Sequence, residues 1–496
     1  MSKKIRPFLF VLAASIQILQ IFTLSEAQDL DVRISMDEKT PASIRVEGRF
    51  LLAERPNRQN LIFLRDHAGT SGLAERFTSV ELLGSGGAPL QFRKLIAGEY
   101  LADGNIDSWT YGVSLAPTGR PSSYAHVSWL GPDRGILMMG DLMPQIAGSS
   151  PVASRVFITL PAGWETQTTE RRASDGSFDV ADIDKAVFVV SRRGSFRKLN
   201  ARIGSPQVIV FDNWLFGDSD ASAMAAEIAG GYTKVFGAPA PADALVTIMR
   251  FPGDVKTGAW EADTRGGSVT ILSSDMPFKS QSLQRLHEQL RHEMFHLWIP
   301  NGVNLSGKYD WFYEGFALYQ SLKFGVASNR IRFDDYLAAL SQAFVIDNIQ
   351  PQRISLIEAS KQRWAGANTQ VYARGMLTAF LCDIAMLRNS RGKLSVDDLL
   401  RDVYRRFHAT PNRLDGNQAI LELMREREEL RPVVDAYVTG SNKIDGGAEM
   451  LAAGIDRIND NSLPNLKVVP KPDRRQRDLL DRLGYNNWRK LSEGTK

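Results

Sequence analysis

Short apolar runs separated by turn residues characterise the N-terminal part of the chain. Runs rich in β-branched and aromatic residues recur between clusters of Gly, Pro, Asn and Asp, at 43–52, 60–64, 77–83, 109–115, 155–160 and 186–190. Short strands at such spacing are typical of sheets that pack face to face. The pattern therefore predicts a β-sandwich-like domain over residues 28–204. Within it, the adjacent Asp66 and His67 are interpreted as a surface turn.

The pattern changes near Val208. Three short apolar runs, 208–211, 245–250 and 268–273, predict strands, and 221–235 predicts a helix after the first of them. From about residue 282 the apolar residues follow the helical period, which predicts further helices over 311–324, 333–343, 372–387, 396–407, 416–428 and 432–438. A small mixed sheet followed by a mostly helical lobe is an α+β arrangement, in which a cleft forms where the lobes meet.

The first 27 residues have the pattern of a secretory signal peptide. A basic start is followed by an apolar stretch and by a small-x-small site ending at Ala27, so the mature chain is expected to begin at Gln28. An uncleaved membrane anchor is the alternative, because the apolar stretch is long, although Gln17 and Gln20 interrupt it. No later segment approaches the roughly 18 uninterrupted apolar residues that span a bilayer. We expect an exported protein, secreted or periplasmic, without stable membrane insertion after cleavage.

Composition and charge narrow the class of protein. A chain of 496 residues, 43% of them hydrophobic, is too long for one ordinary core and suggests two or three domains. The net charge of +4 falls close to neutral once the basic N-terminal segment is removed, and the remaining Lys and Arg are scattered. A nucleic-acid partner is therefore not expected. The single cysteine, Cys382, lies in an apolar run and is expected to be a buried thiol.

The residues that carry chemistry are His-Glu-Met-Phe-His at 292–296. On a helix, His292 and His296 are four residues apart and point the same way, so they can hold one Zn²⁺ with Glu293 beside them as a base. A catalytic zinc takes three protein ligands and keeps an open position. Glu314, 18 residues beyond His296, is the predicted third ligand.

This motif has two other interpretations. The histidines could satisfy hydrogen bonds in a core, but the helix presents its leucine stripe on a different face. The chain could also be an exported metal-bearing binding protein without catalysis. A purely structural zinc site usually has a fourth protein ligand and has no use for the base Glu293. The sequence favours an enzyme with one zinc ion per chain.

These stretches resemble the zinc motifs of the glycyl aminopeptidase family of gluzincin metallopeptidases, relatives of the aminopeptidase N family. The matching residues are His-Glu-Met-Phe-His-Leu-Trp at 292–298 and Trp-Phe-Tyr-Glu-Gly-Phe at 311–316. Tyr-Ala-Arg-Gly-Met at 372–376 is similar to the family's Tyr-x-Lys-Gly-Ala segment, with Arg374 in place of lysine, and 435–440 resembles the segment that closes its catalytic domain.

The resemblance implies a thermolysin-like zinc peptidase domain over residues 205–455, which acts on peptide or protein substrates. It also implies that the Tyr372 phenol stabilises the oxyanion of the reaction, although a tyrosine at the start of an apolar helix can simply pack on a core. Family members often carry a PDZ domain next, which we do not expect here. Residues 456–496 are predicted to be a C-terminal tail with a docked short helix, because Leu479, Leu480 and Leu483 have helical spacing.

The position of the cut in the substrate depends on one acid. An aminopeptidase needs a carboxylate to pair with the substrate's α-ammonium group. The family's Gly-Gly-x-Glu-His segment corresponds to Gly-Gly-Ser-Val-Thr at 266–270, which lacks the acid. Gly-Ala-Trp-Glu-Ala at 258–262 resembles the Gly-x-Met-Glu-Asn segment of aminopeptidase N relatives and implies that Glu261 holds the amine. If Glu261 is only a solvated loop carboxylate, an endopeptidase is the alternative; the oligomeric state stays open.

Overall fold

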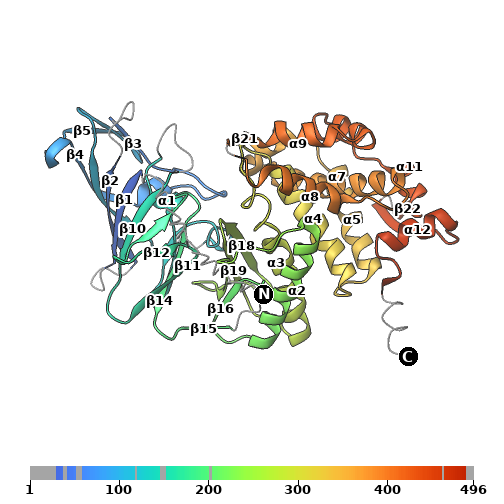
Figure 1. Cartoon of the computed structure of the whole chain (residues 1–496), viewed down its shortest axis with the longest axis horizontal. Helices are drawn as coiled ribbons and strands as arrows, with labels where there is room; N and C mark the ends of the chain where they lie inside the picture. Colours follow the sequence, from blue (N-terminus) through green and yellow to red (C-terminus); the bar gives the residue numbers. More distant parts are fainter. Residues whose placement is uncertain are drawn as a thin grey trace, which may run out of the picture.

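The computed structural model describes residues 29–36, 42–51, 59–117, 120–145, 152–199, 204–410, 412–460 and 463–487. The predicted signal segment and its cleavage site lie outside these residues. None of the described helices is long and apolar enough to span a membrane. In Figure 1 a domain of strands and a lobe of helices lie at opposite ends of the molecule, with a small sheet and two helices between them.

The N-terminal domain is a β-sandwich, as predicted. Its larger sheet has the order β12-β13-β10-β1-β2-β7-β4 and its smaller one the order β11-β14-β9-β8. Buried side chains of both sheets, such as Val46 and Tyr111 from the first and Leu137 and Phe188 from the second, form one core. The alternating burial along β2 and β7 explains this packing, because every second side chain points inward.

The strands of this domain have the following bounds. They are β1 (Leu30–Met36), β2 (Ser43–Phe50), β3 (Asn60–Ile62), β4 (Phe77–Leu83), β5 (Phe92–Ile96), β6 (Glu99–Ala102), β7 (Ser108–Ser114), β8 (Trp129–Leu130), β9 (Arg134–Met138), β10 (Ser154–Thr159), β11 (Trp164–Thr168), β12 (Arg171–Arg172), β13 (Phe178–Val180) and β14 (Val187–Arg192), with α1 (Met139–Leu142) after β9. A further small sheet has the order β3-β6-β5.

A five-stranded mixed sheet follows, in the order β15-β16-β17-β19-β18. Its strands are β15 (Phe196–Lys198), β16 (Gln207–Phe211), β17 (Leu245–Arg250), β18 (Trp260–Arg265) and β19 (Ser268–Ser273). The three central strands are parallel and largely buried, whereas β15 and β18 are antiparallel edge strands. β15 precedes the predicted boundary at residue 204 but pairs with β16.

This sheet is covered on both faces. Val246 and Ile248 of β17 belong to the same core as the helices α2 (Asp218–Phe236) and α3 (Lys279–Phe295). Ile209 and Met249 pack with Trp129 and other residues of the N-terminal domain's smaller sheet. The middle sheet is therefore fixed to the N-terminal domain on one face and carries the helices on the other, as parallel strands buried on both faces require.

The helical lobe and the C-terminal elements complete the chain. They comprise β20 (Leu305–Ser306), α4 (Asp310–Ala327), α5 (Phe333–Asn348), α6 (Leu356–Lys361), the 3₁₀ turn η4 (Arg363–Ala365), α7 (Asn368–Asn389), α8 (Val396–Phe407), β21 (Leu414–Asp415), α9 (Gly416–Arg425), α10 (Arg431–Val433) with a π turn over Val434–Val438, α11 (Gly447–Ala452), β22 (Ile455–Asp460), β23 (Leu463–Val468) and α12 (Arg474–Arg482). Cys382 on α7 is buried, as expected.

The segment predicted as a tail forms a hairpin of β22 and β23 followed by α12. The backbone N–H of Leu466 on β23 donates to Ser341 Oγ of α5 over 2.9 Å. Leu479, Leu480 and Leu483 are buried in the core of the helical lobe, as their helical spacing predicted. The predicted boundary at residue 455 falls on the first residue of β22.

Candidate metal centre and active site

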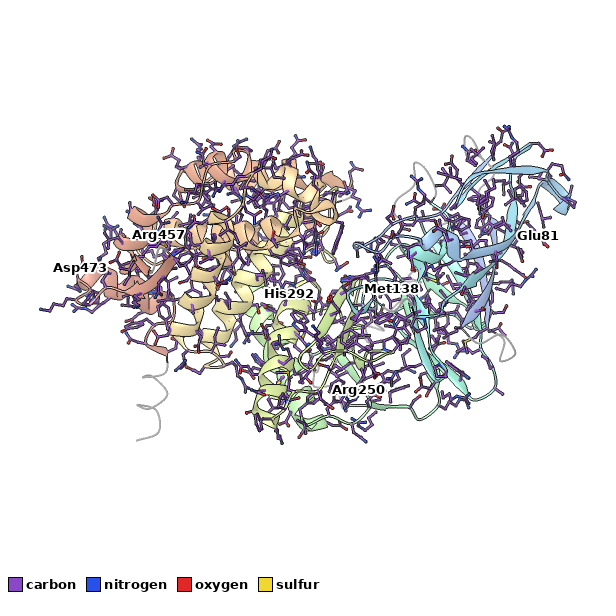
Figure 2. The ribbon with its side chains drawn as sticks, turned by 180° about the vertical axis from the view of Figure 1, so that it is seen from behind. Glu81, Met138, Arg250, His292, Arg457 and Asp473 are labelled. Carbon is purple, nitrogen blue, oxygen red and sulfur yellow. The ribbon has the colours of Figure 1, made fainter. Side chains whose placement is uncertain are left out.

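The helix α3 positions the first two candidate ligands. Leu286, Leu290 and Met294 face the core, while His292 and His296 emerge on another face of the helix. α3 ends at Phe295, and His296 is its C-cap with helical backbone angles, so the four-residue spacing still aligns the two rings. Their Nε2 atoms are 3.3 Å apart. Figure 2 shows His292 at the junction between the helices and the middle sheet.

The helix α4 brings Glu314 to the same point. Its Oε2 atom is 3.3 Å from Nε2 of His292 and 3.6 Å from Nε2 of His296. One ligand atom from each of the three residues lies within 4.8 Å of the others, and all three residues are buried. The structure therefore brings together the three ligands predicted from the spacing.

The chemistry of these three groups fits a metal ion. His296 Nδ1 is 3.0 Å from the carbonyl oxygen of Ile299 and donates its proton there, so in the neutral ring Nε2 carries the lone pair that can bind a metal ion. Glu314 Oε2 is buried without a hydrogen-bond partner among the described residues. Burial alone would lower the pKa of His296, but the Glu314 carboxylate raises it to about 9. The point of convergence thus favours a positive charge, and two imidazoles with one carboxylate are a zinc ligand set.

Glu293 lies beside this point without belonging to the ligand set. Its Oε1 atom is 4.0 Å from Nε2 of His292, and its Oε2 atom accepts a hydrogen bond of 2.9 Å from the Thr264 hydroxyl. Burial raises the pKa of Glu293 above its usual range. A carboxyl group with a raised pKa, held against a strand, is suited to accept and release a proton.

Tyr372 lies beside Glu314, near the start of α7. Its ring centroid is 6.4 Å from that of His292. Burial, with the charge of Glu314, raises the pKa of Tyr372 well above its usual value, so the phenol keeps its proton. A protonated phenol in this position can donate a hydrogen bond into the cleft.

Arg363, in the turn η4, connects these groups and was missed in the sequence. Its Nη1 atom is 2.9 Å from Asp310 Oδ1 and 3.0 Å from Glu314 Oε1, and its Nη2 atom is 2.6 Å from the Tyr372 hydroxyl. Burial would raise the pKa of Glu314, but Arg363 and His296 hold it well below its usual range. No sequence motif identifies Arg363. It lies on a separate element from Glu314, so no helical or strand periodicity relates the two residues.

Glu261 lies on the edge strand β18, not on a loop. Its Oε2 atom is 3.9 Å from His126 Nε2, and its side chain is about one-third exposed. Asp263, two residues along the strand, is 3.5 Å from His126 Nδ1 and accepts a hydrogen bond of 2.8 Å from Arg265 Nε. Asp263 lines the cleft but is already paired with Arg265 and His126, whereas Glu261 is not among the residues that line the cleft, and its contact with His126 is longer.

The ligands line a cleft of about 890 Å³ with walls from both domains. Asp66 and His67, interpreted from the sequence as a surface turn, line it as well. Burial and Arg265 lower the pKa of His67 to about 4, so its neutral ring accepts the hydrogen bond from Arg265 Nη2. The Trp364 ring of η4 lies 6.0 Å from that of His126. The N-terminal domain thus forms one wall of the site.

No protein-family model and no curated protein matches this chain. The chain is similar to the crystal structure of an aminopeptidase N family protein from Idiomarina loihiensis, at 15% sequence identity and a TM-score of 0.69, over 90% of this chain and 82% of that one. An M1 zinc metallopeptidase from Deinococcus radiodurans matches at 15% identity and a TM-score of 0.56, over 84% of this chain and 95% of that one. A variant of it bound to the substrate Tyr-Ser-Ala gives a TM-score of 0.54 at 15% identity, over 83% and 94% of the two chains. The chain therefore has the two-domain fold of these zinc metallopeptidases.

Proposed function

We propose that this protein is a zinc metallopeptidase that hydrolyses peptide bonds. The observation that carries the proposal is the convergence of His292, His296 and Glu314. Glu314 Oε2 has no hydrogen-bond partner among the described residues and lies 3.3 and 3.6 Å from the two histidine Nε2 atoms. The fold shared with zinc metallopeptidases supports the assignment. A structural metal site would need neither the base Glu293 nor a cleft beside the ligands, and both are present here.

Each side chain has a task in this reaction. A zinc ion held by the three ligands would polarise the scissile carbonyl and lower the pKa of a bound water toward about 7. Glu293 takes a proton from the attacking water and delivers it to the leaving amine. Tyr372 donates a hydrogen bond to the oxygen on which negative charge develops. Thr264 keeps the Glu293 carboxylate in place through its hydroxyl.

We propose that the substrates are peptides with a free amino terminus. The solved relatives include an aminopeptidase N family protein and a zinc metallopeptidase bound to the tripeptide Tyr-Ser-Ala. Glu261 supports the proposal, since it is a partly exposed carboxylate on β18 and directly precedes residues 262–265, which line the cleft. An endopeptidase is the second candidate, because the Gly-Gly-Ser-Val-Thr segment at 266–270 carries no acid.

Zinc removal tests the proposal for the enzyme. The purified protein is depleted of metal with a chelator and assayed on a mixed peptide library before and after addition of zinc. We expect about one zinc per chain, cleavage only with zinc, and loss of both zinc and cleavage in His296→Ala. Cleavage that survives depletion, or equal zinc in the variant, would contradict the ligand assignment.

We also propose that the protein is exported with its first 27 residues removed. The basic, apolar and small-residue pattern of that segment supports this. Expression of the full chain in a two-membrane bacterium, followed by N-terminal sequencing of the periplasmic fraction, tests it. A mature protein beginning at Gln28 is expected, and an intact Met1 in a membrane fraction would instead support an anchor.

A further inference from the structure

We infer that Arg363 is the positioning residue of this site, acting on the metal through Glu314 and on the substrate through Tyr372. The inference rests on the proposed function. It starts from one buried guanidinium whose two terminal nitrogens bond to two different groups of the site. No other described cation contacts both of these side chains within hydrogen-bond or ion-pair distance.

The first contact determines which oxygen of Glu314 faces the histidines. Arg363 Nη1 holds Oε1 over 3.0 Å, so Oε2 is left to face Nε2 of His292 and of His296. Without this bond the carboxylate could rotate about its terminal torsion, which is broad for glutamate. Groups that hydrogen-bond to ligating carboxylates typically change metal affinity or activity by about 10- to 100-fold when they are removed.

The second contact determines where the Tyr372 proton points. A guanidinium has only donors, so in the 2.6 Å contact with Arg363 Nη2 the phenol oxygen is the acceptor. The single phenol proton must then point away from Arg363. The Glu314 carboxylate lies within hydrogen-bonding reach of the phenol, so this orientation directs the phenol hydrogen toward the metal ligands. The donor is thereby oriented before the substrate arrives.

Arg363 is itself held in one place. Asp310, at the start of α4, accepts from Nη1 over 2.9 Å, and Asn368 accepts from Nε over 3.3 Å. The guanidinium carbon lies 4.5 Å from the centre of the Trp364 ring. A lysine at this position would keep the charge but, as a single point donor, could not hold two separate groups in a fixed plane.

Zinc affinity of Arg363→Lys is the first test, and it needs no peptidase activity. The dissociation constant for zinc is measured by competition with a coloured chelator on wild type and variant. We expect binding to weaken by about 10- to 100-fold. Arg427→Lys is the matched control, because Arg427 also pairs with a partly buried carboxylate, Asp402 at 2.6 Å, but does not line the cleft. Its zinc affinity should equal that of wild type.

Kinetics at saturating zinc form the second test. Arg363→Lys should lower kcat by at least about 10-fold with little change in KM, as for a contact that acts in the transition state. In a Tyr372→Phe background the same substitution should lower kcat much less, because the phenol it orients is gone, while the loss of zinc affinity should persist. If the losses of kcat from Arg363→Lys and Tyr372→Phe are additive, Arg363 does not act through Tyr372.

The two tests separate this inference from the proposed function. If wild type binds zinc but cleaves no peptide, the proposed peptidase function is wrong. The ratio of the zinc dissociation constants of Arg363→Lys and wild type would still test whether Arg363 positions Glu314. If Arg363→Lys does not fold by circular dichroism, Asp310→Asn replaces it, since it loosens the same guanidinium and should weaken zinc binding in the same direction. Wild-type zinc affinity in a folded Arg363→Lys or Asp310→Asn would overturn the inference.

Discussion

At the scale of single residues, three side chains of the site share one arrangement: one polar atom faces the point of convergence and another is held by the protein, whereas His292 Nδ1 has no hydrogen-bond partner among the described residues. His296 is held at Nδ1 by the Ile299 carbonyl, Glu314 at Oε1 by Arg363, and Glu293 at Oε2 by Thr264. The remaining atoms, Nε2, Oε2 and Oε1, lie at or near the point of convergence. Little reorganisation is then required when a metal and a substrate bind.

One residue outside the site should make stability depend on pH. Burial, reinforced by Asp243 and Asp182, raises the pKa of Glu170 to about 7. The folded state then holds this proton more tightly than the unfolded state, in which the pKa of a glutamate is near its ordinary value of 4.5. The contribution of this proton to the free energy of unfolding is fully present below pH 4.5 and is lost as the pH rises through about 7.

Glu170→Gln should therefore gain thermal stability relative to wild type at pH 8, with a much smaller gain at pH 4.5. Differential scanning calorimetry of both proteins at the two values measures this. An equal difference in melting temperature at both values would show that Glu170 ionises normally in the folded chain.

The sequence identified the site residues that lie close together along one helix. His292, Glu293 and His296 could be predicted because an i, i+4 spacing on a helix fixes their mutual position. Arg363 and Thr264 could not, because their contacts with Glu314 and Glu293 join separate elements of the fold. The roles of Tyr372 and Glu261 came from a resemblance and stay predictions.

At the scale of elements, the packing of α4 against α7 places Glu314 beside Tyr372. The two helices touch at their glycines: a Cβ on Gly315 would lie 2.4 Å from the Gly375 backbone, and one on Gly375 would lie 2.6 Å from the carbonyl oxygen of Trp311. Only glycine allows this approach. Each glycine is next to a site residue or one turn from it, so the contact sets the spacing of the site.

Gly375→Ala should destabilise the fold by about 1–3 kcal/mol, the usual cost of overpacking, and should also weaken zinc binding because α4 must move. Gly230→Ala on α2 is the control, since a Cβ there meets no atom within 4 Å. That substitution should leave zinc affinity unchanged and raise stability by up to about 1 kcal/mol. Chemical denaturation and zinc titration measure both. Wild-type stability in Gly375→Ala would mean that the helices are not in contact.

Most elements could be predicted from periodicity, and the failures have a physical reason. The strands at 77–83, 245–250 and 268–273 agree with the structure to the residue. The edge strand β18 was missed because its residues are mostly half-buried and polar, so it has no apolar run. The hairpin of β22 and β23 was missed for a similar reason: few of its side chains are buried, and it is held by contacts with α5.

At the scale of the whole molecule, the cleft is formed by segments far apart in the sequence. The N-terminal domain provides the loop with His67 and also His126, the middle sheet provides β18, and the helical lobe provides Glu314 and Tyr372. The predicted cleft between sheet and helices is present, but the contribution of the N-terminal domain could not be predicted. Packing between domains leaves no periodic signal in a sequence.

The interdomain position of Glu261 gives a test of substrate choice. If Glu261 pairs with the α-ammonium group, wild type should prefer free peptides over N-acetylated ones, and Glu261→Ala should lose that preference by raising KM for free peptides. Glu165→Ala is the control, because it lies on β11, which contributes no residue to the cleft, whereas β18 borders the cleft through residues 262–265. A preference that survives in Glu261→Ala would assign the amine to another acid, and equal cleavage of blocked peptides would indicate an endopeptidase.

The most direct test of the central claim is a paired measurement on Glu293→Gln. Zinc content and peptide hydrolysis are measured on the same preparation of wild type and variant. Because the amide cannot accept a proton from water while His292, His296 and Glu314 are untouched, we predict about one zinc per chain in both proteins and hydrolysis only by wild type. Undiminished hydrolysis by the zinc-loaded variant would contradict the role of Glu293 as the base.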